Sequence, residues 1–275
     1  MIHRSFLILI TLPAVLLFNS CKHASKTDEY YRAANDLVLN SDFVNAKKKY
    51  LLAIEADTTN WRACYQLAGV YQMEGDFRDA AYYFSKTVSI NPKCALGFYA
   101  RANLLELVGD EKGGMRDLKT ALDLKKDLFL AQLSKGRKEY SSGKYQVAIE
   151  DLNAAIALRQ DFFLAFGMRG NCKLKTGDLD GAIKDFDKEI QLRPDYVMGY
   201  VSRAMTYTEQ KNYRAAINDI NTCLNADPLW SQGYIYRGMI QQQAGAKDSA
   251  CIDFNLAYKM KNPQAEGYVK EFCGK

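Results

Sequence analysis

Cysteine and histidine are the side chains of this chain that could most readily bind a metal or act as nucleophiles. There are seven cysteines and two histidines among 275 residues. No two cysteines stand in a C-x-x-C spacing, and His3 and His23 both lie close to the N-terminus. Zinc sites need clustered thiolate and imidazole ligands, so the sequence predicts no metal and no cofactor. In an oxidising compartment, the thiol pair to test for a disulfide is Cys251 with Cys273.

Motifs for catalysis and for nucleic-acid binding are also missing from the sequence. It contains no phosphate-binding glycine loop, no nucleophile elbow and no paired-carboxylate motif. Its net charge of +5 comes from 37 basic and 32 acidic residues spread along the chain, whereas nucleic-acid binders usually carry a basic stripe. We therefore expect a non-enzymatic protein that takes neither a small-molecule substrate nor nucleic acid.

Basic residues and aspartates recur in register along most of the chain. Each basic residue is followed sixteen positions later by an aspartate: Arg101 and Asp117, Lys135 and Asp151, Arg169 and Asp185, Arg203 and Asp219, Arg237 and Asp253. Thirty-four residues before the first pair, the same positions hold Leu67 and Tyr83, so both change together. We interpret the pairs as partly buried ion pairs between two helices, because unpaired charge beside a core is costly. A charged row that binds a ligand is the alternative.

The same step of thirty-four residues governs the apolar positions. Small residues recur at Ala46, Ala80, Gly114, Ala148, Ala182, Ala216 and Ala250, and again at Ala34, Ala68, Ala102, Gly136, Gly170, Ala204 and Gly238. Large apolar residues recur at Tyr50, Phe84, Leu118, Leu152, Phe186, Ile220 and Phe254. A fixed period of this length indicates an array of structural repeats.

Each period of thirty-four residues predicts two helices joined by a tight turn. In residues 61–94, apolar residues stand at the i, i+3, i+4 and i+7 spacing of a helix face: Cys64, Leu67, Ala68 and Tyr71. Gly75 ends this helix, and glycines or their replacements mark the same turn in the other units: Ser41, Gly109, Gly143, Gly177, Lys211 and Gly245. A second helix follows and stops before Pro92. Small residues are expected where the two helices cross closely.

This pattern resembles the tetratricopeptide repeat (TPR), with its best match at Cys64, Leu67, Ala68, Tyr71, Ala80, Phe84 and Pro92. The resemblance implies an all-α fold, a right-handed superhelical solenoid of seven helix-turn-helix repeats. The expected units are 27–60, 61–94, 95–128, 129–162, 163–196, 197–230 and 231–264, followed by a short C-terminal capping helix within 265–275.

Proteins of this family bind extended peptides or partner helices on the concave surface, through fixed positions of each first helix. The resemblance places the following residues there: Tyr31, Asn35, Tyr65, Tyr99, Asn103, Arg137, Tyr140, Asn171, Met198, Val201, Met205, Ile235 and Met239. Tyrosine and methionine supply contact area, and asparagine bonds to an extended backbone. Alternatively, some of them pack between neighbouring first helices. Tyr31 and Tyr99 replace the lysine of the family's carboxylate clamp, so its chaperone-tail ligand is disfavoured.

The N-terminus is typical of an exported protein. Arg4 precedes an apolar stretch from Phe6 to Phe18, which is too short to span a bilayer. The stretch ends at Ser20-Cys21, which resembles the lipobox of bacterial lipoproteins. We expect a signal peptide at 1–20, lipidation of Cys21 and a tether at 21–26; ordinary signal cleavage nearby is the alternative. Lys22 in place of aspartate favours the outer membrane.

Together these features predict a lipid-anchored TPR scaffold in the periplasm, held by its anchor at the outer membrane. It would recruit an envelope protein or peptide through its concave groove. The alternative is a permanent structural subunit of an envelope assembly complex, serving outer-membrane, secretion or peptidoglycan machinery.

Overall fold

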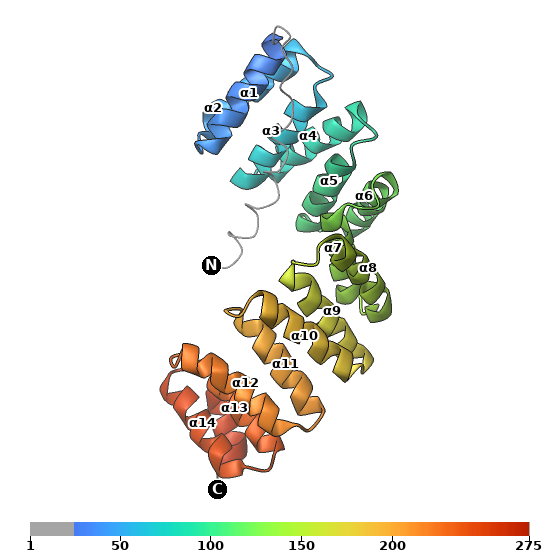
Figure 1. Cartoon of the computed structure of the whole chain (residues 1–275). Coiled ribbons are helices and arrows are strands. Elements are labelled where there is room, and N and C mark those ends of the chain that lie inside the picture. The colour runs from blue at the N-terminus through green and yellow to red at the C-terminus, as the bar shows by residue number, and fades with distance from the viewer. Residues whose placement is uncertain (1–24, 275) are drawn as a thin grey trace. The chain divides into compact units, whose positions relative to one another are not determined.

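The structure is a computed structural model, and it describes residues 25–274. Every regular element in this range is a helix (Figure 1). The helices are α1 (Lys26–Leu39), α2 (Phe43–Ala56), α3 (Trp61–Glu74), α4 (Phe77–Ile90), α5 (Ala95–Leu107), α6 (Glu111–Leu124), α7 (Phe129–Ser141), α8 (Tyr145–Leu158), α9 (Phe163–Thr176), α10 (Leu179–Leu192), α11 (Val197–Glu209), α12 (Tyr213–Ala226), α13 (Ser231–Gln243), α14 (Lys247–Lys259), α15 (Ala265–Tyr268) and the π-helical segment η1 (Val269–Cys273).

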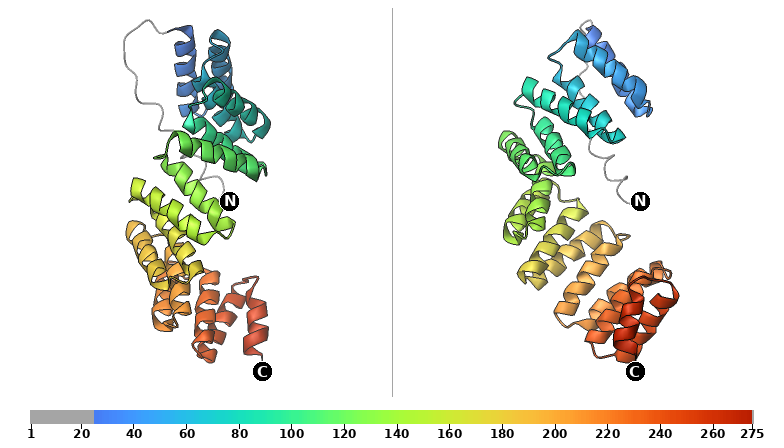
Figure 2. Two further views of the ribbon diagram at one scale, coloured as in Figure 1. Left: turned by 90° about the vertical axis from the view of Figure 1, so that its right-hand side faces the viewer. Right: turned by 180° about the vertical axis from the view of Figure 1, so that it is seen from behind.

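The chain divides into two compact units, 1–131 and 132–275. In the first unit, α1 pairs with α2, α3 with α4, and α5 with α6; in the second, α9 pairs with α10, α11 with α12, and α13 with α14. Within each unit, consecutive pairs pack in chain order (Figure 2). The expected helix-turn-helix pattern is therefore present.

Turns within the pairs need a residue in the left-handed region of backbone space. Positive φ angles occur at the five expected glycines: Gly75, Gly109, Gly143, Gly177 and Gly245. Ser41 and Lys211 adopt the same conformation at φ 59° and 60°, which is unfavourable for a residue with a β-carbon. The turn geometry is thus set by the repeat even where the sequence lacks glycine.

Small residues allow the paired helices to approach closely. A β-carbon at Gly114 would lie 3.0 Å from the carbonyl oxygen of Ala102, and one at Gly170 would lie 2.7 Å from Phe186 Cε1. The large residues of the period fill the remaining space and are almost completely buried: Tyr50, Phe84, Leu118, Leu152, Phe186, Ile220 and Phe254. The core of each unit is therefore a row of similar layers.

The C-terminal segment covers the last helix pair. Tyr268 stacks on Phe254 with ring centroids 5.1 Å apart, and Phe272 lies 6.0 Å from the same ring. A disulfide joins Cys251 on α14 to Cys273 at the end of η1. These are the two cysteines that the sequence indicates as the pair to test for a disulfide. The cap is thus α15 and η1, held by aromatic packing and one covalent link.

The expected signal peptide and Cys21 lie outside the described residues, as does the tether up to residue 24. None of the helices within residues 25–274 combines the length and the apolar character that crossing a bilayer requires.

Candidate protein-interaction surface

The recurring basic and acidic residues lie against each other as ion pairs. The shortest nitrogen–oxygen distances are 2.5 Å for Arg101–Asp117, 2.6 Å for Lys135–Asp151, 2.5 Å for Arg169–Asp185, 2.6 Å for Arg203–Asp219 and 2.7 Å for Arg237–Asp253. Each arginine donates from Nε and Nη2 to both oxygens of its aspartate. Bidentate pairing of this kind orients both groups strongly. The aspartates are buried and each contacts its basic partner, which favours the structural interpretation over a ligand-binding row.

The same arginines also reach back to the preceding helix pair, which sequence reasoning missed. Arg169 Nη1 donates to Asn153 Oδ1 at 2.7 Å, and Arg237 Nη1 donates to Asn221 Oδ1 at 2.7 Å. Arg101 and Arg203 make the corresponding contacts with Ser85 at 3.4 Å and Asp187 at 2.5 Å. The sequence does show a polar residue sixteen positions before each of these arginines, and this pattern could have indicated the contact. Each arginine therefore links two consecutive second helices.

Lysine at position 135 leaves its aspartate incompletely paired. Lys135 Nζ donates to Asp151 Oδ1 at 2.6 Å, whereas Asp151 Oδ2 is buried without a hydrogen-bond partner. Burial raises the pKa of the Asp151 carboxyl, and the opposing effect of Lys135 is smaller. Lysine therefore leaves one oxygen of this aspartate without the second hydrogen bond that the arginines supply.

The tyrosines expected in the groove of the first unit differ in exposure. Tyr31 and Tyr65 are half-buried, and Tyr65 contacts Phe84 edge-on at 5.8 Å between centroids. Burial raises the pKa of Tyr65 to about 12, with smaller contributions from Cys94, Tyr99 and Tyr31. Tyr99 is only 4% exposed and belongs to the core around Leu118, so placing it on a partner-binding surface was wrong.

The polar residues expected beside the tyrosines also vary in their contacts. Asn35 accepts a hydrogen bond of 2.6 Å from the Tyr50 hydroxyl, so its amide oxygen supports the fold. Asn103 and Asn171 are partly exposed, and Arg137 is exposed. Tyr140 is half-buried against Tyr145, with ring centroids 5.5 Å apart.

The apolar residues expected in the groove of the second unit also differ in exposure. Met198 is 47% exposed, and Met205 and Met239 are partly exposed. Ile235 is 0% exposed and packs with Ala250 and Phe254, and Val201 is also buried. Placing these two β-branched residues in the groove was wrong, because both side chains are enclosed in the core. The methionines and half-buried tyrosines remain as candidate contact residues.

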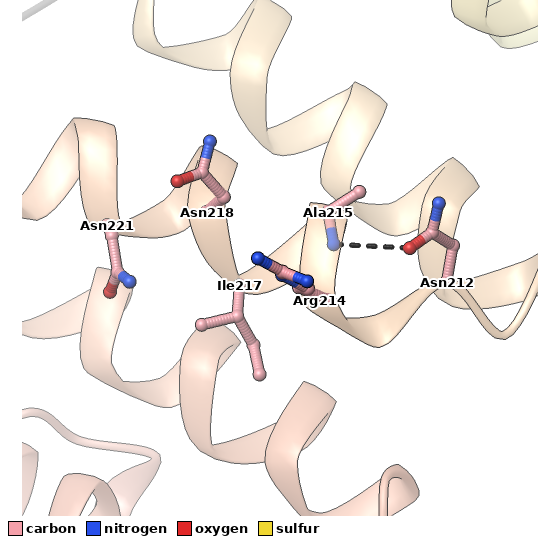
Figure 3. Close-up of a pocket in the computed structure, with 6 residues that line it drawn as sticks. All are labelled: Asn212, Arg214, Ala215, Ile217, Asn218 and Asn221. Atoms are coloured by element: carbon pink, nitrogen blue, oxygen red, sulfur yellow. Dashed lines mark hydrogen bonds between the residues drawn. The ribbon is translucent and has the colours of Figure 1, made fainter.

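A shallow hollow lies on α12, on the second helix of its pair (Figure 3). Its lining consists of Asn212, Arg214, Ala215, Ile217, Asn218 and Asn221. The hydrogen bond drawn there, from Ala215 N to Asn212 Oδ1 at 3.3 Å, caps the helix. No carboxylate, thiol or imidazole lines this hollow. Across residues 25–274, no three metal-binding side chains gather into a site.

Comparison with known proteins agrees with this geometry. Residues 133–197 and 199–228 match family models for the tetratricopeptide repeat. No curated protein matches the sequence significantly.

Solved structures share the fold. A tetratricopeptide repeat protein from Parabacteroides merdae ATCC 43184 is 19% identical, with 90% of this chain and 99% of that chain covered and a TM-score of 0.63. PilW, described as a widely conserved type IV pilus biogenesis factor, is 20% identical, with 75% and 96% covered and a TM-score of 0.64. YrrB, described as a TPR protein with an unusual peptide-binding site, is 17% identical, with 65% and 92% covered and a TM-score of 0.59. The chain therefore has the all-helical TPR solenoid fold.

Proposed function

Because the chain belongs to the tetratricopeptide-repeat family, we propose that it is a membrane-anchored scaffold that recruits an envelope protein through its first helices. Protein–protein interaction is the role that this fold suggests, and the membrane, the envelope and the contact residues are our proposal. No catalytic step is part of it.

The proposal depends mainly on side chains of the first helices that the packing leaves partly uncovered. Tyr65 on α3 and Met198 on α11 are examples, and Asn103 and Asn171 lie on the first helices α5 and α9. Aromatic, amide and thioether groups combine large contact area with hydrogen bonding and adaptable packing. Side chains of this kind suit an extended polypeptide better than a small polar ligand.

Three observations support a place in the cell envelope. The N-terminal sequence resembles that of a lipoprotein, with Cys21 as the lipidated residue. The Cys251–Cys273 disulfide suits an oxidising compartment, since structural disulfides are rare in the cytosol. PilW, with which the chain shares its fold, is described as a pilus biogenesis factor.

Site-specific crosslinking in cells tests this function. A photoreactive amino acid at position 65 or 198 is expected to capture a defined envelope protein. Matched controls use residues of the second helices, Tyr82 at 59% exposure and Ile252 at 69%. Both are more exposed than Tyr65 and Met198, so random collisions would label them more strongly.

Capture from positions 65 and 198 but not from 82 and 252 supports the proposed surface. Capture only from the second helices contradicts it and favours permanent packing in a larger complex. Absence of any adduct from all four positions contradicts a scaffold role in those cells.

A further inference from the structure

Glu189 is a buried carboxylate in a position that the other repeats fill differently. Its equivalents at intervals of thirty-four residues are small or uncharged: Ala53, Thr87, Ala121, Ala155, Cys223 and Ala257. Glu189 is 3% exposed on α10. Sequence analysis missed it, although its departure from the repeat was visible.

A glycine makes room for this side chain. A β-carbon on Gly167 of α9 would collide with Glu189 Oε1, whereas one on Gly199 of α11 would make an ordinary van der Waals contact with Oε2 at 3.4 Å. Gly167 is the fifth residue of its first helix, where the other repeats carry Tyr31, Tyr65, Tyr99, Leu133, Val201 and Ile235. The carboxylate thus occupies the space where a fifth-position side chain would begin, between two successive first helices.

No partner in residues 25–274 neutralises this carboxylate. No hydrogen bond or ion pair reaches it within that range, whereas the five buried aspartates of the ion-pair row each contact a cation. Burial alone raises the pKa of Glu189 to about 7, without a contribution from any lysine or arginine. An unpaired buried charge is costly unless a cation reaches it.

The carboxylate is nevertheless open to a ligand. The enclosed side-chain oxygens without a hydrogen bond in the described residues are Glu139 Oε2, Asp151 Oδ2, Gln241 Oε1 and Gln242 Oε1. Neither oxygen of Glu189 is among these enclosed atoms. Met198, next to Gly199 in the sequence, is an exposed apolar residue of the same helix, at 47% exposure.

We propose that Glu189 binds one lysine or arginine side chain of the partner polypeptide, inserted between α9 and α11 above Gly167 and Gly199. This inference rests on the proposed function and names the chemistry of its ligand. A metal ion is a poorer occupant, since a single carboxylate is too few ligands. A long basic side chain can place its stem on apolar surface while its charge reaches the carboxylate.

Selection from a random dodecapeptide library tests the inference. The wild-type protein is expected to enrich peptides that share one basic residue at a fixed distance from apolar or aromatic residues. Glu189→Gln keeps the shape of the side chain and removes the charge, so it should retain the other preferences and lose the basic one. Glu150→Gln on α8 removes an exposed carboxylate as the matched control and should select like the wild type.

Binding of one selected peptide by fluorescence anisotropy then measures the coupling. Glu189→Gln and replacement of the peptide's basic residue by glutamine should each weaken binding about tenfold or more, and both together little further. Gly167→Ala, which displaces the carboxylate, should also weaken binding. Circular dichroism verifies that each variant is folded.

The outcomes separate this inference from the function on which it rests. Enriched peptides without a fixed basic residue, or equal selection by Glu189→Gln, overturn the inference and leave the scaffold role intact. Failure of the wild type to enrich any peptide contradicts both.

Discussion

Buried charges in this protein differ in how completely they are paired, and this difference has consequences for stability. Arg169, Arg203 and Arg237 each engage both oxygens of an aspartate and one polar group of the preceding helix pair. Such networks contribute mainly when every member is satisfied. Among the described residues, Asp151 and Glu189 are buried carboxylates for which this condition fails.

Lys135→Arg should stabilise the protein by about 1 kcal/mol, because a second N–H would reach the unpaired Oδ2 of Asp151. Urea unfolding measures the variant. A loss of stability would contradict the explanation that Asp151 Oδ2 lacks a hydrogen-bond donor.

Glu189 should make the free protein less stable as the pH rises. Its pKa is about 7 in the folded state and near 4.5 when unfolded, so the folded state binds more protons between these values. Stability therefore decreases from about pH 4.5 to 7 and then levels, by about 3 kcal/mol from this group. Asp151, whose pKa is also raised, acts in the same direction.

Glu189→Gln should accordingly raise the melting temperature at pH 8 and change it little at pH 5. Tyr196 is the titratable neighbour that senses this charge, and the pKa of Tyr196 is raised by burial and then by Glu189. The check is a series of thermal melts from pH 4.5 to 8.5. An unchanged pH profile in the variant would mean that Glu189 does not titrate in this range.

At the scale of elements, each pair depends on a tight turn whose backbone conformation glycine adopts best. Gly177 has φ 83° and Lys211 has φ 60° at equivalent turns. The Lys211 N–H donates to Thr208 O at 2.9 Å and the Gly177 N–H to Leu174 O at 3.2 Å. The two turns therefore share their hydrogen bond, and the β-carbon is the main difference.

Lys211→Gly should stabilise the α11–α12 pair by about 1 kcal/mol, since it relieves a left-handed residue with a β-carbon. The reverse change, Gly177→Lys, should cost a similar amount in the α9–α10 pair. Urea unfolding and amide hydrogen exchange of the flanking helices measure both. Equal effects of the same sign would refute the explanation.

At the scale of the whole molecule, the proposed function combines an anchor, a set of helix pairs and a covalently held cap. The anchor residue Cys21 lies outside the described residues, and α1 begins at Lys26. The five residue steps from Cys21 to Lys26 can extend at most about 18 Å. A lipidated protein would thus carry its first helix pair close to the membrane surface.

Cys21→Ala should therefore release the protein from the membrane to the soluble fraction, because the lipid chains would be lost. Cell fractionation and metabolic labelling with a radioactive fatty acid measure the change. Cys273→Ala is the control, since it removes a cysteine of the cap without affecting the anchor. Labelled, membrane-bound Cys21→Ala protein would exclude lipidation at this residue.

Local information in the sequence determined the helix pairs, their turns and the partners in the ion-pair row. These features repeat every thirty-four residues, and coupled changes such as Leu67 with Tyr83 reveal contacts without a structure. The disulfide partners were also chosen correctly from the sequence.

Only the tertiary structure decided which residues of the first helices remain accessible and which buried charge lacks a partner. Tyr65 is half-buried whereas Tyr99 and Ile235, at the same repeat position, are enclosed. Exposure depends on the sizes of side chains that neighbouring helix pairs bring together. Glu189 shows this dependence most clearly, because its place against α9 exists only where Gly167 leaves space for a carboxylate.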